Sequence, residues 1–155
     1  PVGAFGGRAD IMAHLAPEGP IYQAGTLSGN PVAMAAGMAT LEGLSQPGFF
    51  DALEQKSIQL TEGFKTLAQE AGVPMATEYA GGMFGFFFSE LDKVTSFEEA
   101  TGCDADAFNR FFHSMLDQGV YLAPSLYEAG FISAAHSEED LARTLEAART
   151  AFKSL

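Results

Sequence analysis

The motif with the clearest chemical potential is a glycine-flanked loop that carries two hydroxyl side chains. It covers residues 25–31, GTLSGNP, and leads directly into a helix start. Free N–H groups at the helix N-terminus, the positive end of the helix dipole and the Thr26 and Ser28 hydroxyls together favour a phosphate. The same residues also suit a purely structural role, because glycines permit the turn and Asn30 caps a helix. The residues alone leave both interpretations open, and the spacing is not that of a Walker loop.

A second candidate is Glu128, which lies in the turn between Pro124 and Gly130. A carboxylate in such a loop either faces solvent or lies near a bound substrate. Ser125 and Tyr127 belong to the same segment, and we assign them no role from the sequence.

The remaining reactive side chains are interpreted as structural. Cys103 is the single cysteine, so it has no partner for an internal disulfide or a metal knuckle. His136 precedes a predicted helix start and has no visible catalytic partner, so we interpret it as a helix-start or packing residue. No metal site is expected. The other histidines and the arginines receive no functional role: His14, His113, Arg8, Arg110, Arg143 and Arg149.

The composition describes a globular domain with a strongly acidic surface. Hydrophobic residues make up 47% of the 155 positions and aromatic residues 12%, enough for a sizeable core. The 20 acidic against 8 basic side chains argue against binding to nucleic acid or to an anionic membrane surface. There is no apolar run of ~18 residues and no opening signal peptide. We therefore expect a cytoplasmic protein.

The first part of the chain is predicted to contain two helices. A short amphipathic helix over 8–15 is stopped by the turn at 17–20, and a second helix runs over 31–44. The second helix carries small side chains on most faces, which predicts burial on several sides. Pro and Gly in the stretch 45–48 mark the clearest boundary in the chain.

From residue 49 onward the pattern predicts an α+β unit. It contains a long helix over 49–71, a hairpin, a helix from Asp104 or Asp106 to Gly119, two short strand candidates and a last helix. Ser137 opens that last helix in a capping box with Asp140. This order suits an antiparallel sheet covered by helices on one face. The strand candidates are 74–79, 83–88, 120–122 and 131–133.

Three motifs resemble one family of enzymes. The run IYQAGTLSGNPVAMAAG resembles the segment of class III aminotransferase-like, pyridoxal-phosphate-dependent enzymes that brings a threonine to the cofactor phosphate across a dimer interface. PVGAFGGRADIM resembles the stretch just after the family's Schiff-base lysine. LAPSLYEAGFISAAHSEEDL resembles the C-terminal signature of the glutamate-1-semialdehyde 2,1-aminomutase branch, and Leu27 after the threonine also points to that branch.

The resemblance implies a fold and a set of site residues. It implies the C-terminal part of a fold-type I transferase, an α/β fold. Residues 1–46 would end the large cofactor-binding domain, with the phosphate loop and a buried helix, and residues 47–155 would form the small C-terminal α+β domain. Gly25 and Thr26 would contact the phosphate, with Thr26 reaching the partner's active site in a homodimer. Glu128 would lie near the substrate and the mobile active-site region.

The resemblance also implies an activity. It is an isomerase reaction that converts glutamate-1-semialdehyde to 5-aminolevulinate for tetrapyrrole (porphyrin) biosynthesis, using pyridoxal 5'-phosphate and pyridoxamine 5'-phosphate. The family's lysine lies a few residues before the equivalent of Pro1, so the 155 residues alone are expected to be inactive. None of the four lysines present is a credible replacement: Lys56, Lys65, Lys93 and Lys153.

Alternatives remain open: a related class III transaminase, or a non-catalytic module for dimerisation or phosphate binding.

Overall fold

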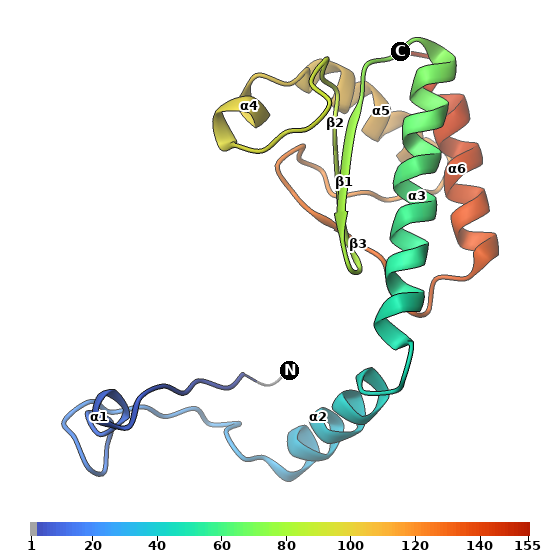
Figure 1. Cartoon of the computed structure of the whole chain (residues 1–155). Coiled ribbons are helices and arrows are strands. Elements are labelled where there is room, and N and C mark those ends of the chain that lie inside the picture. Colours follow the sequence, from blue (N-terminus) through green and yellow to red (C-terminus); the bar gives the residue numbers. More distant parts are fainter. Residues whose placement is uncertain (1–2) are drawn as a thin grey trace. The chain divides into compact units, whose positions relative to one another are not determined.

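The computed structural model describes residues 3–155 and shows a mixed α/β protein of two compact units (Figure 1). The first unit covers Pro1–Phe49 and the second Phe50–Leu155. Pro1 and Val2, which begin the motif PVGAFGGRADIM, lie outside the described residues. Each unit is described by itself below.

The first helix of the N-terminal unit is shorter than predicted. Helix α1 covers Ala9–Met12, whereas the sequence predicted a helix over 8–15. After Met12 the backbone folds back on itself, and the carbonyl of His14 accepts a hydrogen bond from the N–H of Ile21 at 3.0 Å. Backbone groups that pair across this turn are not available to continue the helix, so the prediction was wrong in its C-terminal half.

Helix α2 covers Pro31–Leu44 and begins where the sequence predicted. The Asn30 side chain accepts hydrogen bonds from the N–H groups of Val32 and Ala33 at 3.0 and 3.1 Å. The predicted burial on several sides is not found, since no residue of α2 is buried by the described part of the chain. Val32 is 77% exposed and Met38 63%. Small side chains permit a close neighbour, but residues 3–155 do not supply one.

The C-terminal unit contains an antiparallel sheet of three strands in the order β1-β2-β3. Strands β1 (Ala76–Ala80) and β2 (Met83–Phe87) form the predicted hairpin, and Gly81 in its turn has a φ of +56°, which favours glycine. Strand β3 has only two residues, Gly130–Phe131, and pairs with the start of β2. The α/β class and the antiparallel sheet are confirmed.

Two features of this unit differ from the prediction. Residues 120–122 do not form a strand. Val120 instead donates its N–H to the carbonyl of Met115 at 2.9 Å, which closes the preceding helix. The sequence analysis also missed helix α4 (Phe97–Thr101), which begins at Ser96, whose hydroxyl accepts the N–H of Glu99 at 3.2 Å.

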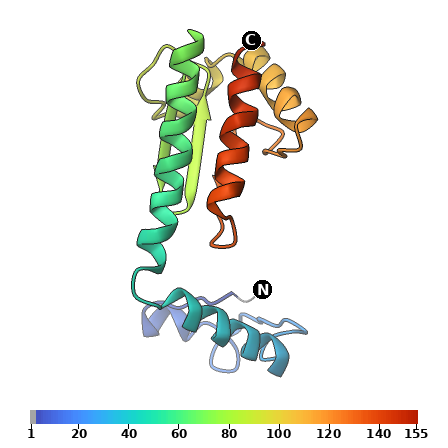
Figure 2. The same ribbon diagram turned by 90° about the vertical axis from the view of Figure 1, so that its right-hand side faces the viewer.

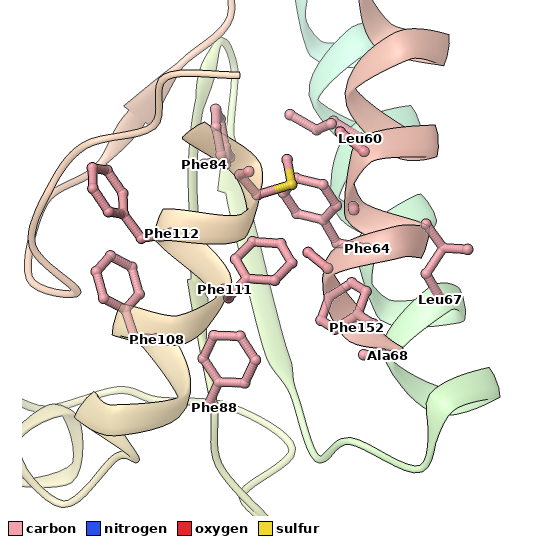
Figure 3. Packing of buried hydrophobic residues seen from close by; sticks show 14 of the residues in the cluster. Leu60, Phe64, Leu67, Ala68, Phe84, Phe88, Phe108, Phe111, Phe112 and Phe152 are labelled. Carbon is pink, nitrogen blue, oxygen red and sulfur yellow. The ribbon is translucent and has the colours of Figure 1, made fainter. Parts of the chain in front are cut away.

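The core lies between the sheet and three helices: α3 (Phe49–Ala71), α5 (Ala105–Asp117) and α6 (Glu138–Phe152). In Figure 2, α3 and α6 run side by side in front of the sheet. Rings from different elements meet at the centre, and those of Phe111 and Phe152 have centroids 4.7 Å apart (Figure 3). The predicted apolar stripes of α3, α5 and α6 and the capping box of Ser137 with Asp140 are confirmed.

Candidate functional site

The loop over residues 25–30 consists of two consecutive tight turns. The N–H of Ser28 donates to the carbonyl of Gly25 at 2.9 Å, and the N–H of Asn30 donates to the carbonyl of Leu27 at 3.0 Å. Gly29 has a φ of +71°, a conformation that strains other residues. A Cβ atom at Gly25 would come within 2.8 Å of the Ser28 Oγ. Gly29 is therefore needed for this backbone conformation, whereas a side chain at Gly25 would require only that the Ser28 hydroxyl turn away.

The start of α2 is already occupied by its own cap. Asn30 Oδ1 takes the N–H groups of Val32 and Ala33, and its carbonyl accepts the N–H of Met34 at 2.9 Å. Pro31 has no N–H to offer. Among the described residues, the helix start therefore has no free N–H group for an anion, and the structure shows Asn30 in the capping role.

The loop itself keeps unpaired donors. Among residues 3–155, the N–H and hydroxyl of Thr26, the N–H of Leu27 and the hydroxyl of Ser28 have no hydrogen-bond partner. These residues line an open hollow of about 700 Å³ within the N-terminal unit. Its other wall comes from α2, through Met34, Gly37, Met38 and Leu41. The hollow can thus offer two hydroxyls and two N–H groups to an oxyanion.

No free cation accompanies these donors within residues 3–49. The unit has no lysine and one arginine, Arg8, whose guanidinium lies 2.7 Å from the carboxylate of Asp10. The hydrogen bond from Arg8 lowers the pKa of Asp10. The loop therefore suits one side of a phosphate site, with the compensating charge coming from elsewhere.

Glu128 lies in the C-terminal unit, at the surface. Its N–H donates to the carbonyl of Ser125 at 3.1 Å, and the N–H of Tyr127 donates to the Ser125 hydroxyl at 3.2 Å. Among residues 3–155, the Glu128 carboxylate has no hydrogen-bond or ion-pair partner. Beside it is an open hollow of about 270 Å³ lined also by Met83 and Phe87 of β2.

The other polar residues discussed from the sequence make hydrogen bonds or ion pairs with nearby protein groups. His136 accepts the N–H of Ser133 at its Nδ1, 2.9 Å away, and Cys103 donates its S–H to the carbonyl of Glu99 at 3.3 Å. Of the lysines, Lys56 donates to the carbonyls of Ala134 and His136. Lys93 pairs with Glu78 at 3.1 Å. All four lysines lie beyond residue 49, outside the unit that carries the Thr26 loop.

Two kinds of feature are absent from the described residues. Between residues 3 and 155, no three His, Cys, Asp or Glu side chains gather as metal ligands. None of the helices described has the length and apolarity that crossing a membrane requires.

The sequence of the whole chain decides its family. The pattern of the family described as "Aminotransferase class-III" matches residues 1–137, which include both the Thr26 loop and the Glu128 segment. The chain belongs to the class III aminotransferases.

Solved structures of transaminases share the fold. An omega-transaminase from Sphaerobacter thermophilus is 25% identical with a TM-score of 0.76, and the match covers 96% of this chain and 34% of that one. A β-phenylalanine aminotransferase from Variovorax paradoxus is 30% identical with a TM-score of 0.76, covering 94% of this chain and 33% of that one. A transaminase with PLP bound, 24% identical with a TM-score of 0.75, shows the same fold over 96% of this chain and 34% of its own. The chain thus spans about a third of the length of these relatives.

Class III aminotransferases use pyridoxal phosphate as their cofactor. The Thr26 loop fits the phosphate end of this cofactor, because its hydroxyl and N–H donors are unpaired and border an open hollow.

Sequence reasoning missed one contact beside the Glu128 segment. The ring of Phe97 in α4 lies against the ring of Tyr127, with centroids 5.8 Å apart. The signal that could have found α4 is the order Ser96-Phe97-Glu98-Glu99, which has the Ser-x-x-Glu pattern of a helix start. Nothing in the sequence pattern predicts its contact with residue 127.

Proposed function

We propose that this chain is the C-terminal part of a pyridoxal-phosphate enzyme, in which the Gly25–Thr26 loop binds the cofactor phosphate. The observation that carries the proposal is the set of unpaired donors at Thr26 and Leu27, which border an open hollow within a motif of the class III family. Thr26 donates its hydroxyl and N–H to phosphate oxygens, and Gly25 leaves the space in which the loop turns. Asn30 holds the end of the loop through its cap.

The cofactor, when bound, provides the electron sink and amine carrier for the reaction. The residues of this chain bind and orient the cofactor and the substrate. The loop fixes the phosphate end, so the reacting end is placed by a rigid anchor. Glu128 offers an unpaired carboxylate, which is suited to accept hydrogen bonds from the substrate or to attract its amine.

For the reaction we propose the isomerisation of glutamate-1-semialdehyde to 5-aminolevulinate, in the cytoplasm. Support comes from Leu27, which lines the hollow next to Thr26, and from the resemblance of residues 122–141 to the aminomutase branch. The test uses a complete enzyme that contains this chain, incubated with glutamate-1-semialdehyde and no amino acceptor. Formation of 5-aminolevulinate is the expected result. No product would overturn the proposal.

A class III transaminase is the second candidate, favoured by the 30% identity to a β-phenylalanine aminotransferase. A transaminase needs an external amino acceptor, whereas an aminomutase returns the amine to the same carbon skeleton. The same assay therefore separates the two, because adding a 2-oxo acid would restore turnover only in a transaminase.

We further propose that the 155 residues alone are inactive. None of the four lysines lies in the unit that carries the Thr26 loop, and two of them are engaged by Ala134, His136 and Glu78. Formation of 5-aminolevulinate by the purified 155-residue chain would contradict this. An isolated phosphate-binding module is disfavoured because the described loop lacks a free cation; titration with phosphate or pyridoxal phosphate is expected to show only weak binding.

The exposed apolar side chains of α2 support association of two copies. Val32, Met38 and Leu41 are all more than half exposed, which is unusual for a helix of such small, apolar composition. We propose a homodimer, as the family resemblance implies. Sedimentation of a complete enzyme that contains this chain, and of its Met38→Glu variant, is the test. A dimer weakened by the charge supports the proposal, and a monomer at all concentrations contradicts it.

A further inference from the structure

Two exposed aromatic rings from distant parts of the sequence lie against each other beside Glu128. Phe97 of α4 is 74% exposed and Tyr127 is 55% exposed. Their ring centroids are 5.8 Å apart with an interplanar angle of 43°. Such a contact joins α4 to the segment over residues 124–130, in which only Gly130 belongs to a strand.

Ser125 stabilises the same segment by hydrogen bonds inside it. Its hydroxyl accepts the N–H of Tyr127 at 3.2 Å and its carbonyl accepts the N–H of Glu128 at 3.1 Å. Ser125 therefore holds the backbone N–H groups of Tyr127 and Glu128, two and three residues further on. The half-buried position of Ser125 keeps this turn against the body of the unit.

Helix α4 has only five residues, but hydrogen bonds and one buried side chain hold it in place, so it can position the ring of Phe97. The Glu99 carboxylate accepts the N–H and the hydroxyl of Thr95 at 2.7 and 3.0 Å, so the helix start is closed on both sides. Ala100 is buried. After the helix, the N–H of Asp104 donates to the carbonyl of Phe88 at 2.9 Å, which ties α4 to the end of β2.

We propose that Phe97 and Ser125 are positioning residues that fix the backbone at Glu128. Phe97 acts through the ring of Tyr127. Ser125 acts through its hydroxyl, which accepts the N–H of Tyr127, and through its backbone carbonyl, which accepts the N–H of Glu128. The importance of this for catalysis rests on the proposed role of Glu128 near the substrate. The positioning itself is a property of the described residues and is testable without any cofactor.

The test is amide hydrogen exchange at Tyr127 and Glu128 in the 155-residue chain, resolved by NMR. An aromatic pair contributes a coupling that corresponds to roughly two- to ten-fold in an equilibrium. Phe97→Ala is expected to accelerate exchange at Glu128 by about that factor. Phe97→Tyr, which keeps a ring, restores the wild-type rate. Ser125→Ala accelerates exchange at Tyr127, and Ser125→Thr restores it.

A double-mutant cycle separates the ring contact from general loosening. Phe97→Ala and Tyr127→Ala are combined and read out at the Glu128 amide, and the double variant is expected to exchange no faster than either single one. The amides of Glu99 and Asp104 serve as internal controls, because their rates stay unchanged if α4 remains folded. Additive effects, or unchanged exchange at Glu128 in Phe97→Ala, would overturn the proposal.

The role of Glu128 is tested separately in a complete enzyme that contains this chain. Phe97→Ala is expected to raise KM for the substrate and to leave cofactor affinity unchanged, and Phe97→Tyr restores KM. Faster exchange with an unchanged KM would leave the positioning in place and overturn the role of Glu128 in the proposed function.

Discussion

At the scale of single residues, one asparagine decides what the Thr26 loop can bind. A helix start with free N–H groups is an anion site, but Asn30 takes the N–H groups of Val32 and Ala33 for itself. The donors left over belong to Thr26, Leu27 and Ser28. The donors that the loop can offer therefore belong to its own turn, and the cap gives that turn a fixed end.

Asn30 can be tested directly. Asn30→Ala removes the acceptor for two N–H groups and is expected to destabilise α2 by about 1 kcal/mol. Asn30→Asp keeps an acceptor at the same place and serves as the control. Amide exchange at Val32 and Ala33 is the measurement. Equal protection in Asn30→Ala and wild type would contradict the capping geometry.

Asp140 gives the start of α6 a dependence on pH. Hydrogen bonds from the Ser137 N–H, then from its hydroxyl, lower the pKa of Asp140 from its ordinary value of 3.8. A carboxylate with a lowered pKa in the folded state stabilises the fold above pH 3.8, and this contribution is lost as the pH falls through the folded value. Asp140→Asn should therefore lower Tm at pH 6, and the difference should shrink as the pH falls below 3.8. Thermal unfolding at several pH values is the measurement, and a Tm difference that stays constant with pH would contradict the assignment.

At the scale of elements, features that depend on neighbouring residues were predicted well from the sequence. Features that depend on distant partners were not. The caps at Asn30 and Ser137 and the apolar stripes of α3, α5 and α6 depend on neighbours along the chain, so the sequence contains them. A strand depends on a partner far away in sequence, and 120–122 has none. Helix α4 is too short for an apolar periodicity, since Ala100 is its single buried residue. Burial of α2 depends on which other part of a protein packs against it, and the sequence of the helix does not specify that partner.

Strand β3 passes over an aromatic ring and needs a glycine there. A Cβ atom at Gly130 would fall on the ring of Phe84, which is buried in the core. Gly130→Ala is expected to destabilise the C-terminal unit by about 1–3 kcal/mol. Gly85→Ala is the matched control in the same sheet, because its nearest atom, Phe87 Cε2, is 4.0 Å away. Urea denaturation measures both, and equal stability of the two variants would contradict the close approach.

Lys56 ties α3 to the segment before α6. Its ammonium donates to the carbonyls of Ala134 and His136. Lys56→Met is expected to cost about 1 kcal/mol, near the low end for a charged donor because the site is partly open to solvent. Lys65→Met, on the exposed side of the same helix, is the control and should be near neutral. If both variants unfold at the same urea concentration as wild type, Lys56 is not a tether.

At the scale of the whole molecule, the residues assigned to the site are divided between the two units. Gly25 and Thr26 belong to the first, in which no described residue is buried. Glu128 belongs to the second, which contains the whole aromatic core. The chain spans about a third of the length of its solved transaminase relatives. The sequence motifs predicted the family. Which hydrogen-bond donors come from the Thr26 loop and which from the start of α2 could be seen only in the structure.

The most direct test of this account is the cofactor affinity of a complete enzyme that contains this chain, with Thr26 replaced. Thr26→Val removes the hydroxyl and keeps the shape, and Thr26→Ser keeps the hydroxyl. The Kd for pyridoxal phosphate, followed by absorbance, is expected to rise roughly ten- to a hundred-fold in Thr26→Val, the loss of one hydrogen bond to a charged group. Thr26→Ser should stay close to wild type. Equal affinity in all three proteins would contradict the assignment of this loop to the cofactor phosphate.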